Sequence, residues 1–395
     1  MTGLELAAWS FPVLLLLIFI RVPIGLAMLL CGLGGAWAIY GSYVPIFNQL
    51  KQVTYSTFSN YSLSVIPLFL LMGQFAALGG LSQALFKAAE AWIGHRKGGV
   101  AMAAVGACAG FGAICGSSLA TAATMGQVAL PELKRAGYAG GISTATLAAG
   151  GTLGILIPPS IMLVLMADQV SVSVGDLFMG ALIPGLLLGV LYMVFIVVVG
   201  FVRPDLVPPR PADAEKLTVR QVGVAFLSTL PTFGLILVVL GSIFFGIATP
   251  TEASGLGAFG AMLLAAANRR LTWQVIRQVG IDTTITTCFI FAIFIGATVF
   301  AYVLRMIGGD ELITEFFKGT GLGPTGLVML VLGVVFVAGF FLDWFEIVLI
   351  ILPLLAPVIK LSGIDMTWFL ILVALMLQTS FLTPPVGFSL FYLKG

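Results

Sequence analysis

Long apolar runs, interrupted mainly by glycine and proline, follow one another along almost the whole chain. The first begins near Trp9 and continues with one interruption to Tyr40. A helix needs roughly 20 predominantly apolar residues to cross the hydrocarbon core of a bilayer. Because such runs recur, the pattern predicts an all-α polytopic membrane protein that is surrounded by the lipid bilayer.

Composition and charge agree with this class and locate one break in the pattern. Of 395 residues, 60% are hydrophobic and 9% are charged, and the mean hydropathy is +1.14. The one linker-like stretch, RPDLVPPRPADAEKLTVRQ, runs from Arg203 to Gln221. We therefore expect a first unit over residues 1–202, a cytoplasmic linker over 203–222 and a second unit over 223–395. The formal net charge of +2 gives no bulk attraction to nucleic acid, so no nucleic-acid partner is expected.

The two units share unusual residues at a common spacing. Five pairs have the same separation along the chain: Pro131 and Pro357, Lys134 and Lys360, Gly137 and Gly363, Pro158 and Pro384, and Pro159 and Pro385. Near the start of each unit, Pro23 of RVPIG matches Pro250 of TPTEA when this separation is lengthened by a single position. Chance would rarely place so many prolines and glycines at one spacing, so the pattern indicates a duplicated unit.

Basic residues set the orientation, because short cytoplasmic loops are enriched in Lys and Arg. With a periplasmic N-terminus, 14 of the 18 Lys and Arg residues lie on the cytoplasmic side. The basic stretches GHRKGG (94–99) and LKRAGY (133–138) then share one side. The segment between them is too short to cross and return, so we expect a re-entrant helical hairpin at about 100–133.

The matching segment of the second unit, at about 325–359, lies between stretches poor in basic residues, GLGPTG and KLSGID. We expect this second hairpin to enter from the outside. The two units are then inverted-topology repeats, an arrangement in transporters that places substrate and ion sites near the middle of the bilayer.

Each unit also contains a proline pair within an apolar run, in GTLGILIPPS (151–160) and TSFLTPPVGF (379–388). Proline removes an amide donor and ends a helix, so we expect broken transmembrane helices at about 140–167 and 366–392. Exposed carbonyl and amide groups are tolerated at membrane depth where they line a cavity or bind a ligand. Carbonyl and hydroxyl oxygens suit sodium, and helix N-termini suit an anion.

The first candidate site combines the hairpin turn with the first break. Hydroxyl groups in GSSLATAAT would face the carbonyl groups around the proline pair. The predicted sodium- and substrate-binding residues are Gly116, Ser117, Ser118, Thr121, Gly154, Pro158, Pro159 and Ser160. Taken singly, small residues and serines often serve only helix packing, but their double occurrence with a proline pair favours a binding role.

The second candidate site repeats this combination in LDWFE and TSFLTPP. Asp343 aligns with Ser117 at the spacing that relates the two proline pairs, and Glu346 follows it. The predicted residues are Asp343, Glu346, Thr379, Ser380, Thr383, Pro384 and Pro385. Acidic residues within apolar segments are functional candidates, although interfacial placement with access to water is the alternative. Glu252 in TPTEA is first of all a helix cap.

Catalytic and cofactor chemistry find little support in the sequence. The four cysteines have no metal-ligand spacing, and His95 is the single histidine and lies in a loop. Asp343 and Glu346 lack an accompanying nucleophile, and no phosphate-binding loop for ATP is present. We therefore expect no enzyme, no cofactor, and no metal other than transported sodium.

The motifs GSSLATAATMGQVALPELKRAGY, GTLGILIPPSI, GIATPTEA and FLTPPVGF resemble the large, DctM-like membrane subunit of tripartite ATP-independent periplasmic (TRAP) transporters. The resemblance covers nearly the whole chain. It implies a sodium-driven elevator mechanism in the bacterial inner membrane, a small four-helix membrane subunit and a periplasmic substrate-binding protein that delivers an organic acid anion. The residues that it carries over are Ser117, Ser118, Gly154, Pro158, Pro159, Thr383, Pro384, Pro385, the region of Asp343 and, more weakly, Thr379.

The sequence leaves the substrate and the mode of transport open. A C4-dicarboxylate, a sugar acid or a similar carboxylate would fit the resemblance as substrate. A stand-alone secondary carrier, or a passive channel or scaffold subunit, would explain many of the same residues. By internal symmetry and by the resemblance, a further helix is expected after TPPV.

Overall fold

The computed structural model describes residues 3–208, 219–309, 315, 319, 321–384, 387 and 389. Most of the described residues are helical, and no strand occurs among them. In chain order the elements are α1 (Gly3–Phe19), α2 (Ile24–Tyr40), α3 (Val44–Ser59), η1 (Tyr61–Ser64), α4 (Val65–Leu78), α5 (Leu81–Ile93), α6 (Gly99–Cys115), α7 (Ser118–Arg135), α8 (Gly140–Leu156), α9 (Ile161–Val170), α10 (Val174–Val202), α11 (Val219–Phe244), α12 (Pro250–Ala267), α13 (Trp273–Met306), α15 (Pro324–Ala338), α16 (Trp344–Glu346), η2 (Ile347–Ile351), α17 (Leu352–Leu361) and α18 (Met366–Ser380).

Several helices have the length and composition of membrane spans. Five helical stretches of the described chain qualify, and a sixth qualifies if α8 and α9, which are bent by 43° at their junction, count as one span. In α10, only 17% of the most apolar window is buried, and Ile183 and Phe195 are among its exposed side chains. Such a surface is stable against lipid rather than water. The helix content, length and apolar composition therefore confirm the expectation of an all-α, multi-pass membrane protein.

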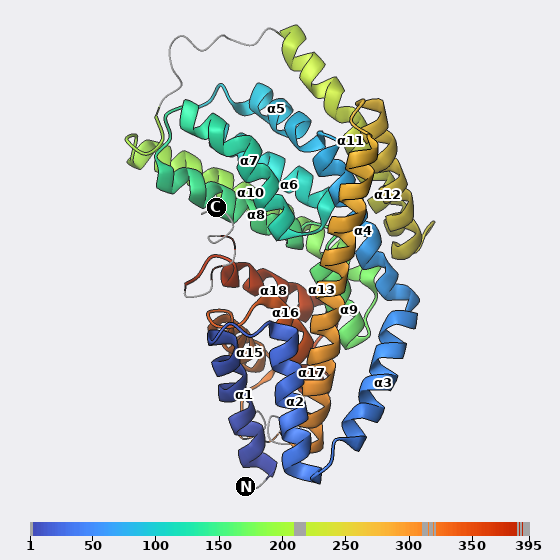
Figure 1. Ribbon diagram of the computed structural model, residues 1–395. Helices are drawn as coiled ribbons and strands as arrows, with labels where there is room; N and C mark the ends of the chain where they lie inside the picture. The colour runs from blue at the N-terminus through green and yellow to red at the C-terminus, as the bar shows by residue number, and fades with distance from the viewer. Residues whose placement is uncertain are drawn as a thin grey trace.

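Figure 1 shows the helices in two groups along the long helix α13. Helices α5, α6, α7, α8 and α10 lie toward one end, whereas α15, α16, α17 and α18 lie toward the other. Helix α9 lies beside α13 and contacts elements of both groups, among them α10 and α17. Two long pairings join the halves of the chain, because α2 packs along α13 and α4 packs along α12. Within the groups, α6 and α7 both pack on α8, and α15 packs on α18.

Side-chain caps explain where many helices begin. Thr249 and Glu252 form a reciprocal capping box at the start of α12: the Glu252 N–H donates to Thr249 Oγ1 (3.3 Å) and the Thr249 N–H donates to Glu252 Oε2 (2.8 Å). This geometry gives Glu252 the capping role that the sequence favours. Other helices have a single capping side chain: Ser117, Ser160, Ser173, Thr272, Asp343 and Asp365.

Candidate functional site

The turn between α6 and α7 consists of Gly116 and Ser117. Gly116 adopts φ +60°, a left-handed conformation that favours glycine, and its N–H donates to the Gly112 carbonyl (2.9 Å). Ser117 then caps α7, because its Oγ accepts a hydrogen bond from the Ala120 N–H (3.4 Å). The two helices therefore reverse direction within this short turn, and the N-terminus of α7 begins at the tip of the hairpin.

The proline break separates α8 from α9. Helix α8 ends at Leu156, the buried Pro158 and Pro159 follow, and Ser160 caps α9 by accepting a hydrogen bond from the Leu163 N–H (3.3 Å). The Ser160 hydroxyl also donates to the Ile155 carbonyl. One side chain thus ties the end of the first half-helix to the start of the second.

The hairpin turn and the break are bonded to each other. The Ile161 N–H, at the first position of α9, donates to the Gly116 carbonyl (3.2 Å). A Cβ added to Gly116 would lie 2.7 Å from the Pro159 carbonyl oxygen, so the two backbones are in direct contact. The structure therefore brings the predicted residues of the first site together.

Gly154 allows this close approach. A Cβ at this position would lie 2.5 Å from Thr121 Oγ1 and 2.9 Å from the Ser117 carbonyl oxygen. On its other side, a Cβ added to Gly112 would lie 2.6 Å from the Gly154 Cα. Real Cβ contacts are not this short, so the hairpin and α8 can meet here only through glycine.

Oxygen atoms are concentrated at this contact. The Ser117 carbonyl accepts hydrogen bonds from the Thr121 N–H (3.0 Å) and the Thr121 hydroxyl (2.8 Å), and Thr121 Oγ1 lies 3.0 Å from Cys115 Sγ. Thr121 is fully buried, Ser118 is buried, and Ser117 is half-buried. The Ser117 carbonyl already accepts two hydrogen bonds, but the hydroxyl oxygens of Ser117 and Thr121 keep a lone pair that can bind a hard cation.

The second turn has a different chemistry at the equivalent position. Asp343, the repeat counterpart of Ser117, caps α16 by accepting a hydrogen bond from the Trp344 N–H (2.7 Å). The next residues form the π-helix η2, a geometry that often occurs at functional sites. A carboxylate therefore replaces the hydroxyl at the tip of the second hairpin, while the capping role is kept.

Two buried acceptors near the second turn and its neighbouring helix lack partners among the described residues. Glu346 is 1% exposed, and its Oε2 atom accepts no hydrogen bond within the described part of the chain. Gln378 on α18 is 4% exposed; its Nε2 donates to the Ala374 carbonyl (3.2 Å), and its Oε1 accepts no bond from any described residue. Unpaired buried acceptors are costly, so each is a candidate to bind a cation or a proton donor. Gln378 is not among the residues predicted from the sequence, although its position directly before Thr379 and Ser380 in an apolar helix was a signal.

The hydroxyl groups of the second site donate to the backbone of their own helix or turn. Thr379 bonds to the Met376 carbonyl (2.7 Å), Ser380 to the Leu377 carbonyl (2.7 Å), and Thr383 to the Thr379 carbonyl (2.9 Å). Their oxygen lone pairs remain as acceptors. Pro384 lies in the turn after α18, whereas Pro385 falls outside the described residues.

Like contacts occur at matching positions of the two halves. A Cβ added to Gly339 would lie 2.9 Å from Ser380 Cβ, so the end of α15 also packs closely against α18. Ser380 is the repeat counterpart of Gly154, and Gly339 falls a single position beyond the counterpart of Gly112. The crossing of a hairpin with the helix that leads to a proline pair is therefore present twice.

A polar cavity of about 690 Å³ lies next to α7, between this helix and the α4–α5 segment. Gln74, Gln83, Thr124 and Gln127 are among its lining residues. Thr124 is one turn from Thr121, so the cavity approaches the first site from the side of α7.

The fold defines a multi-pass helical membrane protein. The family model of the "Tripartite ATP-independent periplasmic transporter, DctM component" matches residues 11–395, and the chain belongs to this family. The resemblance in the sequence is thereby confirmed. Both relatives described below are named as TRAP transporter permeases.

Two relatives and one solved structure illustrate the similarity. The chain is 35% identical over 363 residues to the C4-dicarboxylate TRAP transporter large permease protein DctM of Pseudomonas aeruginosa, covering 91% of this chain and 83% of that protein. It is 28% identical over 381 residues to the isethionate TRAP transporter permease protein DctMQ of Oleidesulfovibrio alaskensis, covering 96% and 59%. The crystal structure of the Alcanivorax borkumensis YdaH transporter is similar in fold, with a TM-score of 0.60, 14% identity and coverage of 88% and 81%.

Proposed function

We propose that this chain is the large membrane subunit of a sodium-driven, binding-protein-dependent TRAP transporter that imports an organic acid anion by an elevator mechanism. The observation that carries the proposal is the bonded unit of hairpin turn and proline break, seen in the Ile161 N–H bond to the Gly116 carbonyl. Polar backbone is stable at membrane depth where it binds something or lines a cavity. The Ser117 helix cap, the Pro159 carbonyl next to Gly116 and the buried Thr121 hydroxyl support an ion site at this contact.

The pairing of helices supports inverted repeats. At the spacing that relates the two units, α2 corresponds to α12, and α4 corresponds to the second part of α13. The contact of α2 with α13 is then the counterpart of the contact of α12 with α4. A pseudo-two-fold axis between the halves would produce such exchanged pairs. The position of the two hairpin groups toward opposite ends of α13 agrees with this axis (Figure 1).

Each of the two sites would bind one coupling ion. In the first, sodium would be held by oxygens of Ser117 and Thr121 and by carbonyls near Gly154 and Pro159. In the second, Asp343, Glu346 and the hydroxyl groups of α18 would hold a second ion. The N-termini of α7 and α9 carry partial positive charge, which favours the acidic group of a substrate. Each bound ion would complete the surface on which that group rests.

The elevator movement would occur between two sets of helices. The paired helices α2, α4, α12 and α13 would form the stationary scaffold, and the hairpins with α8 and α18 would form the moving part. The polar cavity between the α4–α5 segment and α7 supports this division, because water-filled space at that boundary would let the hairpin slide without breaking apolar packing. It would also provide the cytoplasmic exit.

Membership of the TRAP family supports the proposed partner proteins, membrane and substrate class. A TRAP large permease would work with a small four-helix membrane subunit and a periplasmic binding protein in the bacterial inner membrane, here with a periplasmic N-terminus. The names of these two relatives specify a C4-dicarboxylate and isethionate, so the proposed substrate class for this chain is an organic acid anion whose identity the binding protein would largely select.

Reconstitution tests this proposal. The complete chain is placed in proteoliposomes with its small subunit, its binding protein and the anion that the binding protein carries, and uptake is followed with and without an inward sodium gradient. Uptake should require all three proteins and the gradient. Equal uptake by the chain alone would indicate a stand-alone carrier, and flux without any gradient dependence would indicate a passive channel.

A further inference from the structure

A second cavity, of about 920 Å³, lies away from both hairpin turns. It is formed by three segments far apart in the sequence: the α4–α5 turn with the start of α5, the first turns of α11, and the α12–α13 connection. Its charged lining residues are Lys87, Arg220 and Arg270, and no acidic side chain is among its described lining residues. The cavity therefore combines positive charge from elements of both halves of the chain.

Arg270 is held in place by the α4–α5 turn. Its Nη1 donates to Gln83 Oε1 (3.0 Å), and a Cβ added to Gly80 would lie 2.5 Å from the same nitrogen. The guanidinium group thus rests on the Gly80 backbone, where φ is +84°. Next to it, Asn268 Nδ2 donates to the Gly79 carbonyl (3.0 Å). A guanidinium group has about five N–H donors, so the Gln83 bond leaves donors for a further acceptor.

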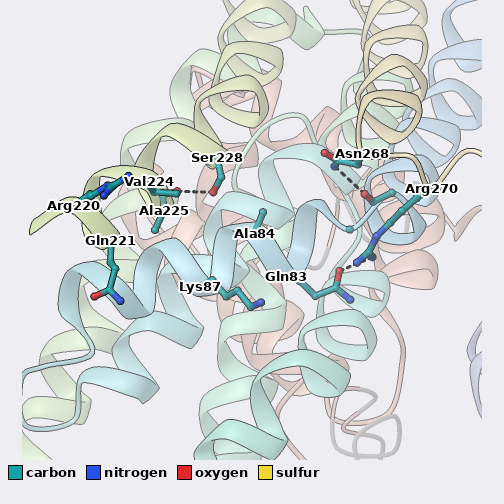
Figure 2. Close-up of a pocket in the computed structure, with 12 residues that line it drawn as sticks. Gln83, Ala84, Lys87, Arg220, Gln221, Val224, Ala225, Ser228, Asn268 and Arg270 are labelled. Atoms are coloured by element: carbon teal, nitrogen blue, oxygen red, sulfur yellow. Dashed lines mark hydrogen bonds between the residues drawn. The ribbon is translucent and has the colours of Figure 1, made fainter. Parts of the chain in front are cut away.

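Figure 2 shows how the polar groups are distributed. Lys87 and Gln83 project from α5 on the side of Arg270, whereas Arg220 and Gln221 lie at the other end of the cavity on α11. An anion in this space would meet Lys87 and Arg270 at one end and Arg220 at the other. Guanidinium and ammonium groups together are typical binders of phosphate oxygens.

The position of Arg220 relates the cavity to the bilayer. The apolar span of α11 covers Arg220–Phe244, so this cation stands at the first residue of a membrane-spanning segment, where lipid headgroups are expected. One and two turns further along, Val224 and Leu227 are 59% and 64% exposed. A ligand with a phosphate group and hydrocarbon chains could bind the cationic cavity through its phosphate and cover the exposed apolar side chains of α11 with its chains.

We propose that this cavity is a binding site for the headgroup of an anionic phospholipid, with its phosphate between Lys87 and Arg270 and its acyl chains against α11. Basic pockets between membrane helices at a bilayer surface suit such headgroups. The lipid would join α5 to α11 and to the α12–α13 connection. None of the proposed ion-site residues lines this cavity, but Gln83, Lys87 and Arg270 also line the neighbouring polar cavity beside α7, together with Glu90 and Glu132.

Native mass spectrometry of the complete purified chain tests the site, with phosphatidylglycerol and phosphatidylcholine as the two lipids. Both carry a phosphate, but only phosphatidylglycerol has a net negative charge. The parent chain should bind phosphatidylglycerol about tenfold more tightly. The double variant Lys87→Gln/Arg270→Gln should lose this preference, Arg220→Gln should reduce it, and Lys87→Arg/Arg270→Lys should keep it.

Arg277→Gln is the matched control, because Arg277 is an exposed cation on α13 that does not line the cavity. This variant should bind as the parent does, and each variant should show a melting temperature close to that of the parent in lipid-free detergent. Equal binding of both lipids by the parent, or an unchanged preference in the double variant, would overturn the proposal. Displacement of phosphatidylglycerol by millimolar inorganic phosphate would overturn the lipid assignment in favour of a free-anion site.

Discussion

Lys360 Nζ donates a hydrogen bond to the carbonyl of Val170, at 3.1 Å and across 190 residues of sequence. Lys360 lies in the last turn of α17, and Val170 is the last residue of α9. The ammonium group therefore stands at the negative end of the half-helix that follows the first proline break. This contact joins α17 to the end of α9.

Replacing Lys360 by Gln should destabilise this link. Loss of a charge-assisted bond at a helix C-terminus costs about 1 kcal/mol, so the melting temperature in detergent should fall. Lys134→Gln is the matched control, because Lys134 occupies the same repeat position in the first half and is exposed. Equal melting temperatures for the two variants would show that the Val170 contact contributes nothing.

Gly154→Ala should disrupt the docking of the first hairpin. The new methyl group would overlap Thr121 Oγ1 and the Ser117 carbonyl, and overpacking of this kind costs about 1–3 kcal/mol. We expect a lower melting temperature together with loss of uptake. The double variant Gly154→Ala/Thr121→Ala should recover stability only in part, because the Ser117 carbonyl remains. Gly141→Ala, at an open position in the same helix, is the control, and equal effects of the two single substitutions would contradict the contact.

Glu346→Gln should separate stability from function. Burying an unpaired carboxylate costs more than burying a neutral amide of similar shape, and Glu346 Oε2 has no partner in the described chain, so the variant should have a higher melting temperature in sodium-free buffer. If Glu346 binds the coupling ion, the same variant should lose most sodium-dependent uptake. Thermal melting and uptake are measured on the same preparation. A stabilised variant with parental uptake would remove Glu346 from the ion site.

Cysteine labelling tests the inverted topology. Single cysteines at His95 and Pro324, introduced after the four native cysteines are replaced, mark the entrances of the first and second hairpins. A membrane-impermeant reagent should reach the two positions from opposite faces of the membrane, because the loops differ in basic charge. Labelling of both positions from one face would rule out inverted repeats.

Local sequence signals account for much of this architecture. Proline pairs, glycines with positive φ and capping hydroxyl groups act within a few residues, so the ends of α6, α7, α8 and α9 could be predicted. Apolar length likewise predicted membrane helices. Two predicted features, the inverted orientation and the ion-binding roles of the site residues, remain predictions.

Contacts between distant segments could not be predicted in the same way. The bond from Ile161 to Gly116, the bond from Lys360 to Val170 and the cationic cavity each depend on helix packing. Gln378 was not predicted for the same reason. Only the packed structure shows that its side-chain amide oxygen is buried without a partner among the described residues. A single sequence contains the residue types but not these juxtapositions.

The first hairpin turn and the first break form the proposed sodium site, and a pair of serines tests this assignment. Ser117→Ala and Ser173→Ala each remove one helix-capping hydroxyl, from α7 and α10 respectively, so both should cost about 1 kcal/mol of stability. Only Ser117 lies at the proposed site. Thr383→Ala probes the second site in the same way, with Ser242→Ala on α11 as its control.

The decisive measurement is initial uptake against sodium concentration in proteoliposomes that contain the complete chain and both partner proteins. Ser117→Ala should raise the sodium concentration for half-maximal uptake about tenfold, which corresponds to a loss of ~1.4 kcal/mol in ion affinity, while Ser173→Ala should leave it unchanged. Parental sodium dependence in Ser117→Ala, or equal uptake without sodium, would contradict the assignment.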